Sequence, residues 1–309
     1  VGNVTNPFEM IDKYGADPVR FYMMTNSEPW DNLKFDPNGV DETRRKFFGT
    51  LYNTYSFFAL YANVDGFDPQ AAQVALEKRP EIDRWILSSL NTLVKGVDKE
   101  LAGYDPTRAG RLIDAFVNDD LSNWYVRLNR KRFWGKEMSE DKLSAYQTLY
   151  TCLMTVAKLL APFAPFYADE LYHDLGGELE SVHLDKFPVA DEAAIDHDLE
   201  ERMAIAQKIT SMVLALRRKV NIKVRQPLQQ IMIPAVDAAQ KAHIEAVADL
   251  LKNEVNVKEV NFIEGQGILV KKVKCNFRVM GKKFGKLMKG VAAQMSALEI
   301  GRASCRERV

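Results

Sequence analysis

The stretch PTRAGRLIDAFVNDDLSNWYVRLNRKRFW, residues 106–134, carries the pattern that decides the fold. Its large apolar residues recur every three or four positions, which is the period of one face of an α-helix. These residues are Ile113, Phe116, Val117, Leu121, Trp124 and Leu128. The spacing predicts one long amphipathic helix, with a face that must be buried against other elements.

The same helical period recurs on both sides of this stretch. It predicts further helices over residues 40–61, 82–97, 142–160 and 165–175. Long amphipathic helices joined by short connections are typical of an antiparallel bundle, and we expect the bundle to occupy residues 41–190.

The first forty residues have a different character. Residues 1–25 predict two short helices, capped by Asn6 and Asp17. Residues 27–39, SEPWDNLKFDPNG, are rich in turn formers and have no helical period. We interpret residues 1–40 as a connector.

Beyond the bundle the pattern changes from helical to alternating. After a helix over residues 199–220, the segments LQQIMIP (228–234), VKEVNFI (257–263) and GILVKKV (267–273) predict strands, with helices over 238–253 and 282–298. We expect a small α+β module over residues 195–299. The predicted fold class is therefore mainly α, an antiparallel helix bundle followed by a small α+β module.

The charge of the chain is balanced overall but uneven along it. Lysine plus arginine and aspartate plus glutamate both total 42, so net charge gives no reason to propose a nucleic-acid partner. Residues 265–298, however, contain basic residues and no acidic one. Such a segment is a candidate contact for a polyanion, and the alternative is a solvated basic face.

Several classes of site are excluded by residue type and spacing. The three cysteines, Cys152, Cys275 and Cys305, form no CxxC pair and have no histidine at ligand spacing, so we assign no metal residue. No nucleophile lies near a base in sequence, so we assign no catalytic residue, and a hydrolase or transferase is a remote alternative. The apolar runs are too short for a membrane span.

The second half of the opening stretch, SNWYVRLNRKRFW (122–134), predicts a nucleic-acid contact. Residues spaced by four, three and four share one helical face, namely Asn123, Arg127, Arg130 and Trp134. Lys131 and Arg132 widen the charge. Guanidinium groups pair with phosphates and stack on unpaired bases, and an indole also stacks, so an anticodon loop offers both targets.

An alternative interpretation of the same segment is structural. Trp124 and Trp134 could be core anchors, and the arginines could pair with acids of a neighbouring helix. For Trp124, which lies on the apolar face, we expect the structural role.

Two further basic groups are candidate backbone contacts. The first comprises Arg217, Arg218, Lys223 and Arg225, and the second comprises Lys282, Lys286 and Lys289. Ammonium groups suit phosphate contact without reading of sequence. The alternative for the first group is a role in capping the preceding helix and pairing with nearby acids.

Several segments resemble isoleucyl-tRNA synthetases, which are class I aminoacyl-tRNA synthetases. NDDLSNWYVRLNRKRFWG (118–135) resembles the matching helix of their anticodon-binding bundle, and LLAPFAPFYADELYHDL (159–175) resembles a helix pair shared with related synthetases. Residues 216–234 and 276–295 resemble later parts of the family, and residues 2–24 resemble the run after its KMSKS loop.

The resemblance implies a tRNA-binding part of a longer enzyme. It implies that the parent charges isoleucine tRNA in an ATP-dependent reaction, as a cytoplasmic monomer. Its catalytic domain would use ATP with Mg²⁺, whereas this chain has no HIGH or KMSKS motif, so we expect it to bind no cofactor and to be inactive alone. The expected partner is isoleucine tRNA, with no membrane. Tyr22, Trp30 and Phe35 are expected to pack against the preceding catalytic domain.

Both ends of the sequence carry further expectations. The first residue is Val1, so we expect the chain to begin inside a longer protein. The final segment IGRASCRERV, residues 300–309, resembles a translated sequencing adapter, and we expect it to be non-native. Two alternatives stay open for the whole chain, namely a valyl- or leucyl-type synthetase and a helical interaction scaffold without an RNA role.

Overall fold

The computed structural model describes residues 5–135, 137–234 and 238–263, together with positions 285 and 290. The chain separates into two compact units, Val1–Ala204 and Ile205–Val309.

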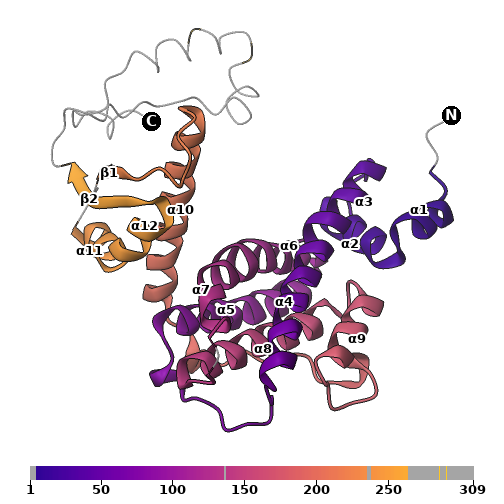
Figure 1. The fold of residues 1–309 in the computed structure, drawn as a ribbon. Coiled ribbons are helices and arrows are strands. Elements are labelled where there is room, and N and C mark those ends of the chain that lie inside the picture. The colour runs from indigo at the N-terminus through magenta and orange to yellow at the C-terminus, as the bar shows by residue number, and fades with distance from the viewer. Residues whose placement is uncertain (1–4, 136, 235–237, 264–284, 286–289, 291–309) are drawn as a thin grey trace. The chain divides into compact units, whose positions relative to one another are not determined.

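Three short helices open the first unit, namely α1 (Pro7–Tyr14), α2 (Ala16–Asn26) and α3 (Pro37–Thr43) (Figure 1). The prediction that Asn6 caps the first helix is confirmed, because its side chain accepts a hydrogen bond from the Phe8 N–H at 3.0 Å. The prediction that Asp17 caps the second is wrong. Gly15 adopts φ of 91° and starts α2 two residues earlier, so the Asp17 carboxylate instead accepts from the Tyr167 N–H at 2.6 Å.

The aromatic residues expected to face a preceding domain are divided between core and surface. Tyr22 is buried with Val19 and Val40, and Phe35 packs against that cluster. The expectation is therefore wrong for Tyr22 and Phe35, which fill a local core. Trp30 is exposed.

Four long helical segments form the predicted bundle. The first combines α3, the π-helical turn η1 (Arg44–Phe48) and α4 (Gly49–Asp65). The second is α5 (Glu81–Ala102). The third combines α6 (Pro106–Ala115), the π-helical segment η3 (Phe116–Val126) and α7 (Arg127–Phe133). The fourth is α8 (Glu140–Leu160), followed by the shorter α9 (Pro165–Asp174).

Short 3₁₀ turns occur in the connections. They are η2 (Leu76–Lys78), η4 (Val182–Leu184) and η5 (Glu192–Ala194). The η5 turn leads into α10 (His197–Lys219), which begins in the first unit and ends in the second.

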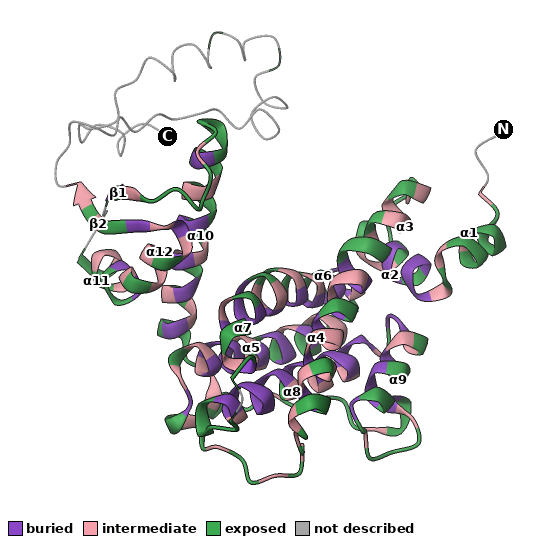
Figure 2. Ribbon diagram, in the orientation of Figure 1, coloured by how far each residue is buried: buried purple, intermediate pink, exposed green. Residues whose placement is uncertain are grey.

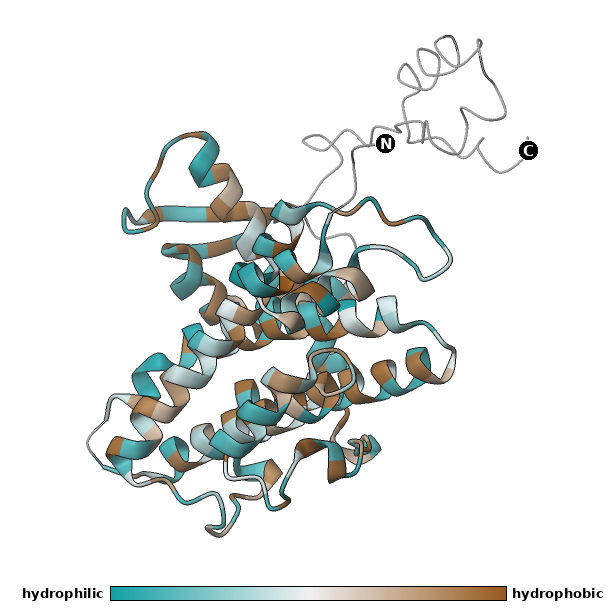
Figure 3. Ribbon diagram, turned by 90° about the vertical axis from the view of Figure 1, so that its right-hand side faces the viewer, coloured by the Kyte–Doolittle hydropathy of each residue, from teal (hydrophilic) through white to brown (hydrophobic). Residues whose placement is uncertain are grey.

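Large apolar side chains from the bundle helices make one core. Trp85 of α5, Tyr125 of η3 and Tyr146 of α8 are among the largest fully buried side chains. The buried residues follow the inward faces of α5 and α8 (Figure 2). Hydrophobic residues, brown, and hydrophilic residues, teal, occur together on single helices, as expected for amphipathic helices (Figure 3). Burial of such apolar faces is the main force that stabilises a bundle.

The η3 segment widens the buried face of its helix. A π-helix forms i to i+5 hydrogen bonds and is rare at this length. Trp124, Tyr125 and Val126 are consecutive and all buried, which a single α-helical stripe would not produce. The predicted helix over residues 106–134 is therefore confirmed in extent, with a different winding at its centre.

The second unit contains a small parallel sheet beside helices. Strands β1 (Leu228–Pro234) and β2 (Val257–Ile263) pair in parallel, with Leu228 opposite Val257. Between them lie α11 (Ala238–Ala246) and α12 (Ala248–Val255), where we predicted one helix. The expected strand at 267–273 and helix at 282–298 lie outside the described residues. The mainly α fold with a small α+β module is confirmed.

Within the described part of the chain, no helix is both long and apolar enough to cross a bilayer. No group of three or more histidine, cysteine, aspartate or glutamate side chains is placed for a metal ion among those residues.

Candidate nucleic-acid interface

The end of η3 and the whole of α7 present a basic, exposed surface, which we call the α7 face. Its members are Asn123, Arg127, Arg130, Lys131 and Trp134, each exposed to solvent. The Trp134 side chain is 56% exposed, unlike the other large rings of this helix. Among the described residues, the side chains of Arg130 and Lys131 form no ion pair. All five of these predicted residues are therefore at solvent.

Arg127 is held on this surface by its own helix. Its Nε donates to the carbonyl oxygen of Asn123 at 2.8 Å, and its guanidinium carbon lies 5.6 Å from the centre of the Trp124 ring. A cation over an indole face is attracted by the ring quadrupole. Trp124 itself is buried, as expected for a core anchor. These contacts hold the guanidinium of Arg127 beside Trp124, while the residue as a whole is exposed to solvent.

Trp134 follows the last turn of α7, where three cations gather. Arg130, Lys131 and Arg132 belong to this turn, and cations are favoured at the carboxyl end of a helix by the exposed carbonyl groups. The backbone N–H of Trp134 donates to the Lys131 carbonyl oxygen at 3.3 Å, which places Trp134 at the end of this turn. An exposed ring beside cations is a suitable platform for a nucleic-acid base.

Arg132 does not join the α7 face. Its side chain is 14% exposed and forms an ion pair with Asp83 of α5, which is fully buried. It also pairs with Asp141 at 2.8 Å. The structural alternative for the arginines of this segment is therefore correct for Arg132, because carboxylates already neutralise its charge.

The ion pair of Arg132 and Asp83 shifts the pKa of Arg132 and of the neighbouring Tyr125. Burial alone would lower the pKa of Arg132, but the hydrogen bonds and charge of Asp83 outweigh burial and raise that pKa above its ordinary value. Burial, followed by the charge of Asp83, raises the pKa of Tyr125 well above its ordinary value. Arg132 thus stays charged and Tyr125 stays neutral at physiological pH.

Arg217 of the second unit also turns inward. It is 3% exposed, and its two terminal nitrogens donate to four backbone carbonyl oxygens, those of Lys223, Gln226, Val255 and Asn256, at 2.7 to 3.2 Å. This guanidinium closes the loop after α10 onto the end of α12. It is therefore not presented to a ligand at the surface.

Of the other basic residues predicted to contact RNA in this unit, some lie among the described residues and some do not. Arg218, Lys223 and Arg225 are exposed. Lys282, Lys286 and Lys289 lie outside the described residues, so the structure gives no account of them.

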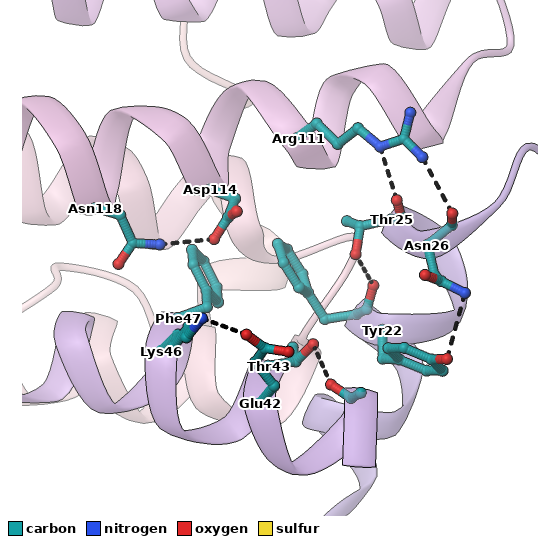
Figure 4. Close-up of a pocket in the computed structure, with 12 residues that line it drawn as sticks. Tyr22, Thr25, Asn26, Glu42, Thr43, Lys46, Phe47, Arg111, Asp114 and Asn118 are labelled. Atoms are coloured by element: carbon teal, nitrogen blue, oxygen red, sulfur yellow. Dashed lines mark hydrogen bonds and ion pairs between the residues drawn. The ribbon is translucent and has the colours of Figure 1, made fainter. Parts of the chain in front are cut away.

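A cavity of about 380 Å³ lies in the first unit, between α2, the start of the α3 segment and α6 (Figure 4). Its polar side chains bond mainly to one another or to nearby backbone. Arg111 donates to the carbonyl oxygens of Thr25 and Asn26, and Asn118 donates to Asp114. Burial and then the charge of Asp119 raise the pKa of the Asp114 carboxyl. The two bonds of Arg111 join α2 to α6 and thus to the bundle.

Sequence reasoning did not single out Asp83. It lies between Ile82 and Trp85 in the apolar pattern of α5, next to positions that we expected to face the core. An acidic residue at such a position requires a partner, since a buried unpaired carboxylate is costly. The position was a signal that a basic partner must come from another helix.

Part of the chain matches a known protein family. Residues 83–233 match the family described as the anticodon-binding domain of tRNA ligase. The match begins at Asp83 and includes the whole α7 face and β1 up to Ile233.

Curated relatives share most of this sequence. The isoleucine--tRNA ligase of Bacteroides fragilis is 66% identical over 304 residues, covering 96% of this chain and 27% of the relative. That of Porphyromonas gingivalis is 61% identical, covering 96% of this chain and 26% of the relative. That of Clostridium novyi is 40% identical over 96% of this chain. The chain thus spans little more than a quarter of the relatives it matches.

A solved structure also aligns with part of the chain. The LeuRS–tRNA–LeuAMS ternary complex of Agrobacterium radiobacter K84 covers 63% of this chain and 22% of its own, with 19% identity and a TM-score of 0.49. From the sequence match and the curated relatives, residues 83–233 belong to the anticodon-binding domains of tRNA ligases, within a chain that is homologous to isoleucine--tRNA ligases along nearly its whole length.

Proposed function

We propose that the α7 face binds the anticodon stem and loop of a tRNA. The observation that carries the proposal is the exposed set of Arg127, Arg130 and Lys131 beside the exposed indole of Trp134. Cations alone would suit any polyanion. A cationic surface with an adjoining aromatic ring suits RNA whose bases are unstacked, as they are in a loop.

Each member of the face has a distinct role in this proposal. Arg130 and Lys131 contact phosphates, where charge rather than base identity decides the affinity. Trp134 stacks on an unpaired base. Asn123 and Arg127 lie one helical turn away, and they offer amide and guanidinium donors to base edges or to the backbone.

The second unit adds backbone contacts in the same proposal. Arg218, Lys223 and Arg225 are exposed and can approach phosphates. Lys282, Lys286 and Lys289 remain predicted phosphate contacts from the sequence. Arg132 and Arg217 leave the set of RNA contacts, because their guanidinium groups are buried on protein partners.

The identity of the tRNA and the reaction of the whole protein belong to the proposal as well. The relatives are isoleucine--tRNA ligases, so we assign isoleucine tRNA as the partner. The parent protein would charge that tRNA with isoleucine, using ATP and Mg²⁺ in a domain outside this chain. We also propose a monomer in the cytoplasm. High identity to the isoleucine enzymes favours this reading over a valyl- or leucyl-type enzyme.

Binding of the 309-residue chain to short RNA hairpins tests the proposal. Anticodon stem-loops of isoleucine and valine tRNAs would be labelled with a fluorophore, and their dissociation constants measured by anisotropy across a salt series. The double variant Arg127→Ala with Arg130→Ala should weaken binding at least tenfold. It should also reduce the slope of log affinity against log salt concentration, by about 0.7 to 0.9 for each phosphate contact that is lost. Trp134→Ala should cost about 1 to 3 kcal/mol if the ring stacks on a base.

Lys99→Ala is the matched control, because Lys99 is exposed near the opposite end of α5. It should leave affinity nearly unchanged. If neither hairpin binds at any salt concentration, the interaction-scaffold alternative replaces RNA binding. If both hairpins bind equally and the α7 variants have no effect, the face is not the recognition surface.

A further inference from the structure

Arg132 lies in the middle of the basic run but points away from the α7 face. We propose that the buried pair of Arg132 and Asp83 is a positioning device, which sets the orientation of the α7 face for RNA without contacting RNA itself. This inference rests on the proposed function of that face.

The pair joins three helices at one carboxylate. The two terminal nitrogens of Arg132 donate to the two oxygens of Asp83 at 2.6 and 2.9 Å, which is a bidentate geometry. Tyr125 and Ser144 donate their hydroxyl hydrogens to the same carboxylate at 2.8 and 2.7 Å. Asp83 therefore receives four hydrogen bonds, and through them α5 is tied to α7, η3 and α8.

The bonds continue along the helix that carries the face. Asn129 accepts from Arg132 at 3.0 Å and donates to the backbone carbonyl of Tyr125 at 2.7 Å. A bidentate guanidinium is rigid in plane and direction, so it fixes the rotation of α7 about its own axis. The rotation of α7 decides where Arg130 and Lys131 point, since they are neighbours of Arg132 in sequence.

Trp134 is secured from both sides by buried cations. Arg132 holds the residues before it, and Lys142 holds the residue after it by donating to the carbonyl oxygen of Gly135. Lys142 is 3% exposed and is itself paired with Asp65. The exposed indole thus projects from a short segment whose ends are both fixed to the bundle.

Stability alone explains this arrangement poorly. Replacing a buried ion pair with apolar residues of similar volume is often neutral or stabilising, because desolvation of two charges offsets their attraction. A fixed orientation is what such a pair supplies and an apolar contact does not. Binding surfaces need supporting residues that hold their groups within about 0.5 Å of the productive geometry.

Asp83→Asn gives a test in which charge and geometry predict opposite results. The substitution removes one negative charge near the RNA-binding face, so electrostatics alone would strengthen binding or leave it unchanged. Loss of positioning would weaken it. We expect the dissociation constant for the isoleucine stem-loop to rise roughly tenfold, comparable to the loss of one well-placed contact.

Arg130→Gln and Arg132→Gln form the matched pair that separates contact from positioning. Both remove one guanidinium from the same turn. Arg130→Gln should reduce the salt slope by about 0.7 to 0.9 log units, because a phosphate contact is lost. Arg132→Gln should weaken binding while the slope keeps the value of the unsubstituted chain. The losses of binding free energy from Arg132→Gln and from Asp83→Asn should not add in the double variant, because both substitutions break the same ion pair.

Measurements would be made on the 309-residue chain, well below the unfolding midpoint of each variant. If Asp83→Asn proves unfolded, Arg132→Lys replaces it, since a lysine keeps the positive charge but cannot pair with both oxygens of Asp83 at once. Unchanged or tighter binding by a folded Asp83→Asn or Arg132→Lys chain overturns the inference while the proposed function stands. A smaller salt slope for Arg132→Gln also overturns it. Failure of the unsubstituted chain to bind the hairpin overturns both.

Discussion

Two buried arginines, one in each unit, are neutralised in different ways. Arg132 meets carboxylates, above all Asp83, in the core of the bundle. Within the described part of the chain, Arg217 donates to backbone carbonyl oxygens, where a loop and a helix end converge. Both belong to basic runs that suggested RNA contact in the sequence.

The difference shows what each unit needs from a buried cation. In the bundle, the backbone carbonyl groups already accept hydrogen bonds within their own helices. A buried guanidinium there must therefore pair with a side-chain carboxylate, and this pairing fixes how the helices face one another. In the second unit, the loop after α10 and the end of α12 bring four carbonyl groups together. Those of Lys223 and Asn256 also accept a backbone N–H, and one guanidinium with five donors bonds to all four. One arginine orients helices, and the other closes a loop.

The largest expected effect is loss of the carboxylate in the bundle. Asp83→Leu leaves Arg132 with Asp141 as its acidic partner, and Asp141 is much more exposed than Asp83. We expect the free energy of unfolding of the first unit to fall by about 3 to 5 kcal/mol, the usual cost of breaking a buried pair. Urea denaturation followed by tryptophan fluorescence measures it. The double variant Asp83→Leu with Arg132→Leu should recover most of the loss, and failure to recover would mean that the charges are not coupled.

A smaller loss is expected from the second buried arginine. Arg217→Met removes the donors to four carbonyl groups, some of which can turn to water because they are only partly buried. We expect a loss of about 2 to 3 kcal/mol confined to the second unit. Hydrogen exchange of amides in β1 and β2, compared with those in α8, measures it. Equal loss of protection in both units would contradict a local role.

Low pH should distinguish a buried cation that is paired with a carboxylate, such as Lys142 with Asp65, from one that is bound by backbone carbonyl groups, such as Arg217. Burial alone raises the pKa of Asp65, but hydrogen bonds from Lys142 and Tyr146 outweigh it, so its pKa lies below the ordinary value of 3.8. A lowered pKa means that this stabilisation is complete above the unfolded-state value and is lost as pH falls through the folded-state value. The carbonyl partners of Arg217 do not titrate in this range.

The Asp65→Asn variant isolates that contribution. It should unfold about 2 kcal/mol more easily than the unsubstituted chain at pH 7. The two unfolding curves should begin to converge as the pH falls below about 4, and should meet only below the lowered folded-state pKa of Asp65, where the aspartate is neutral in both states. Thermal unfolding across pH measures the difference. A gap that persisted unchanged at pH 2 would show that the carboxylate charge is not what stabilises Lys142.

The smallest effects should come from exposed neighbours of the two arginines. Arg130→Gln and Arg218→Gln are matched to them in residue type and nearly in position, but their side chains are at the surface. Each should change the free energy of unfolding by less than about 0.5 kcal/mol. Denaturation by urea checks this, and a loss above 1 kcal/mol from either variant would erase the contrast between buried and exposed arginines.

The helical bundle was predictable because its signal is local and repeated. The apolar period along α5, η3 and α8 is long enough to define helices and their buried faces. The cap at Asn6 was predictable for the same reason, while Asp17 was not, since Gly15 permits a start that propensity does not reveal. Element types were therefore easier to predict than their first residues.

The site was only partly predictable because helix spacing gives a face but not its direction. Periodicity brought Arg127, Arg130 and Trp134 to one surface, and the structure places them at solvent. The inward turn of Arg132 depends on Asp83, which is 49 residues away in sequence. The inward turn of Arg217 depends on carbonyl groups that exist only once α12 has formed. Contacts between distant segments decide which member of a basic run is exposed.

The π-helical winding of η3 makes the length of that segment as important as its composition. Deleting one residue between Phe116 and Val126 would let the stretch rewind as an α-helix, and every later residue would turn by about 100° about the axis. Arg132 would then leave Asp83, and the indole of Trp134 would move to another side of the bundle. A homologue that lost a single residue here could keep every cation of the basic run and still present them in the wrong direction.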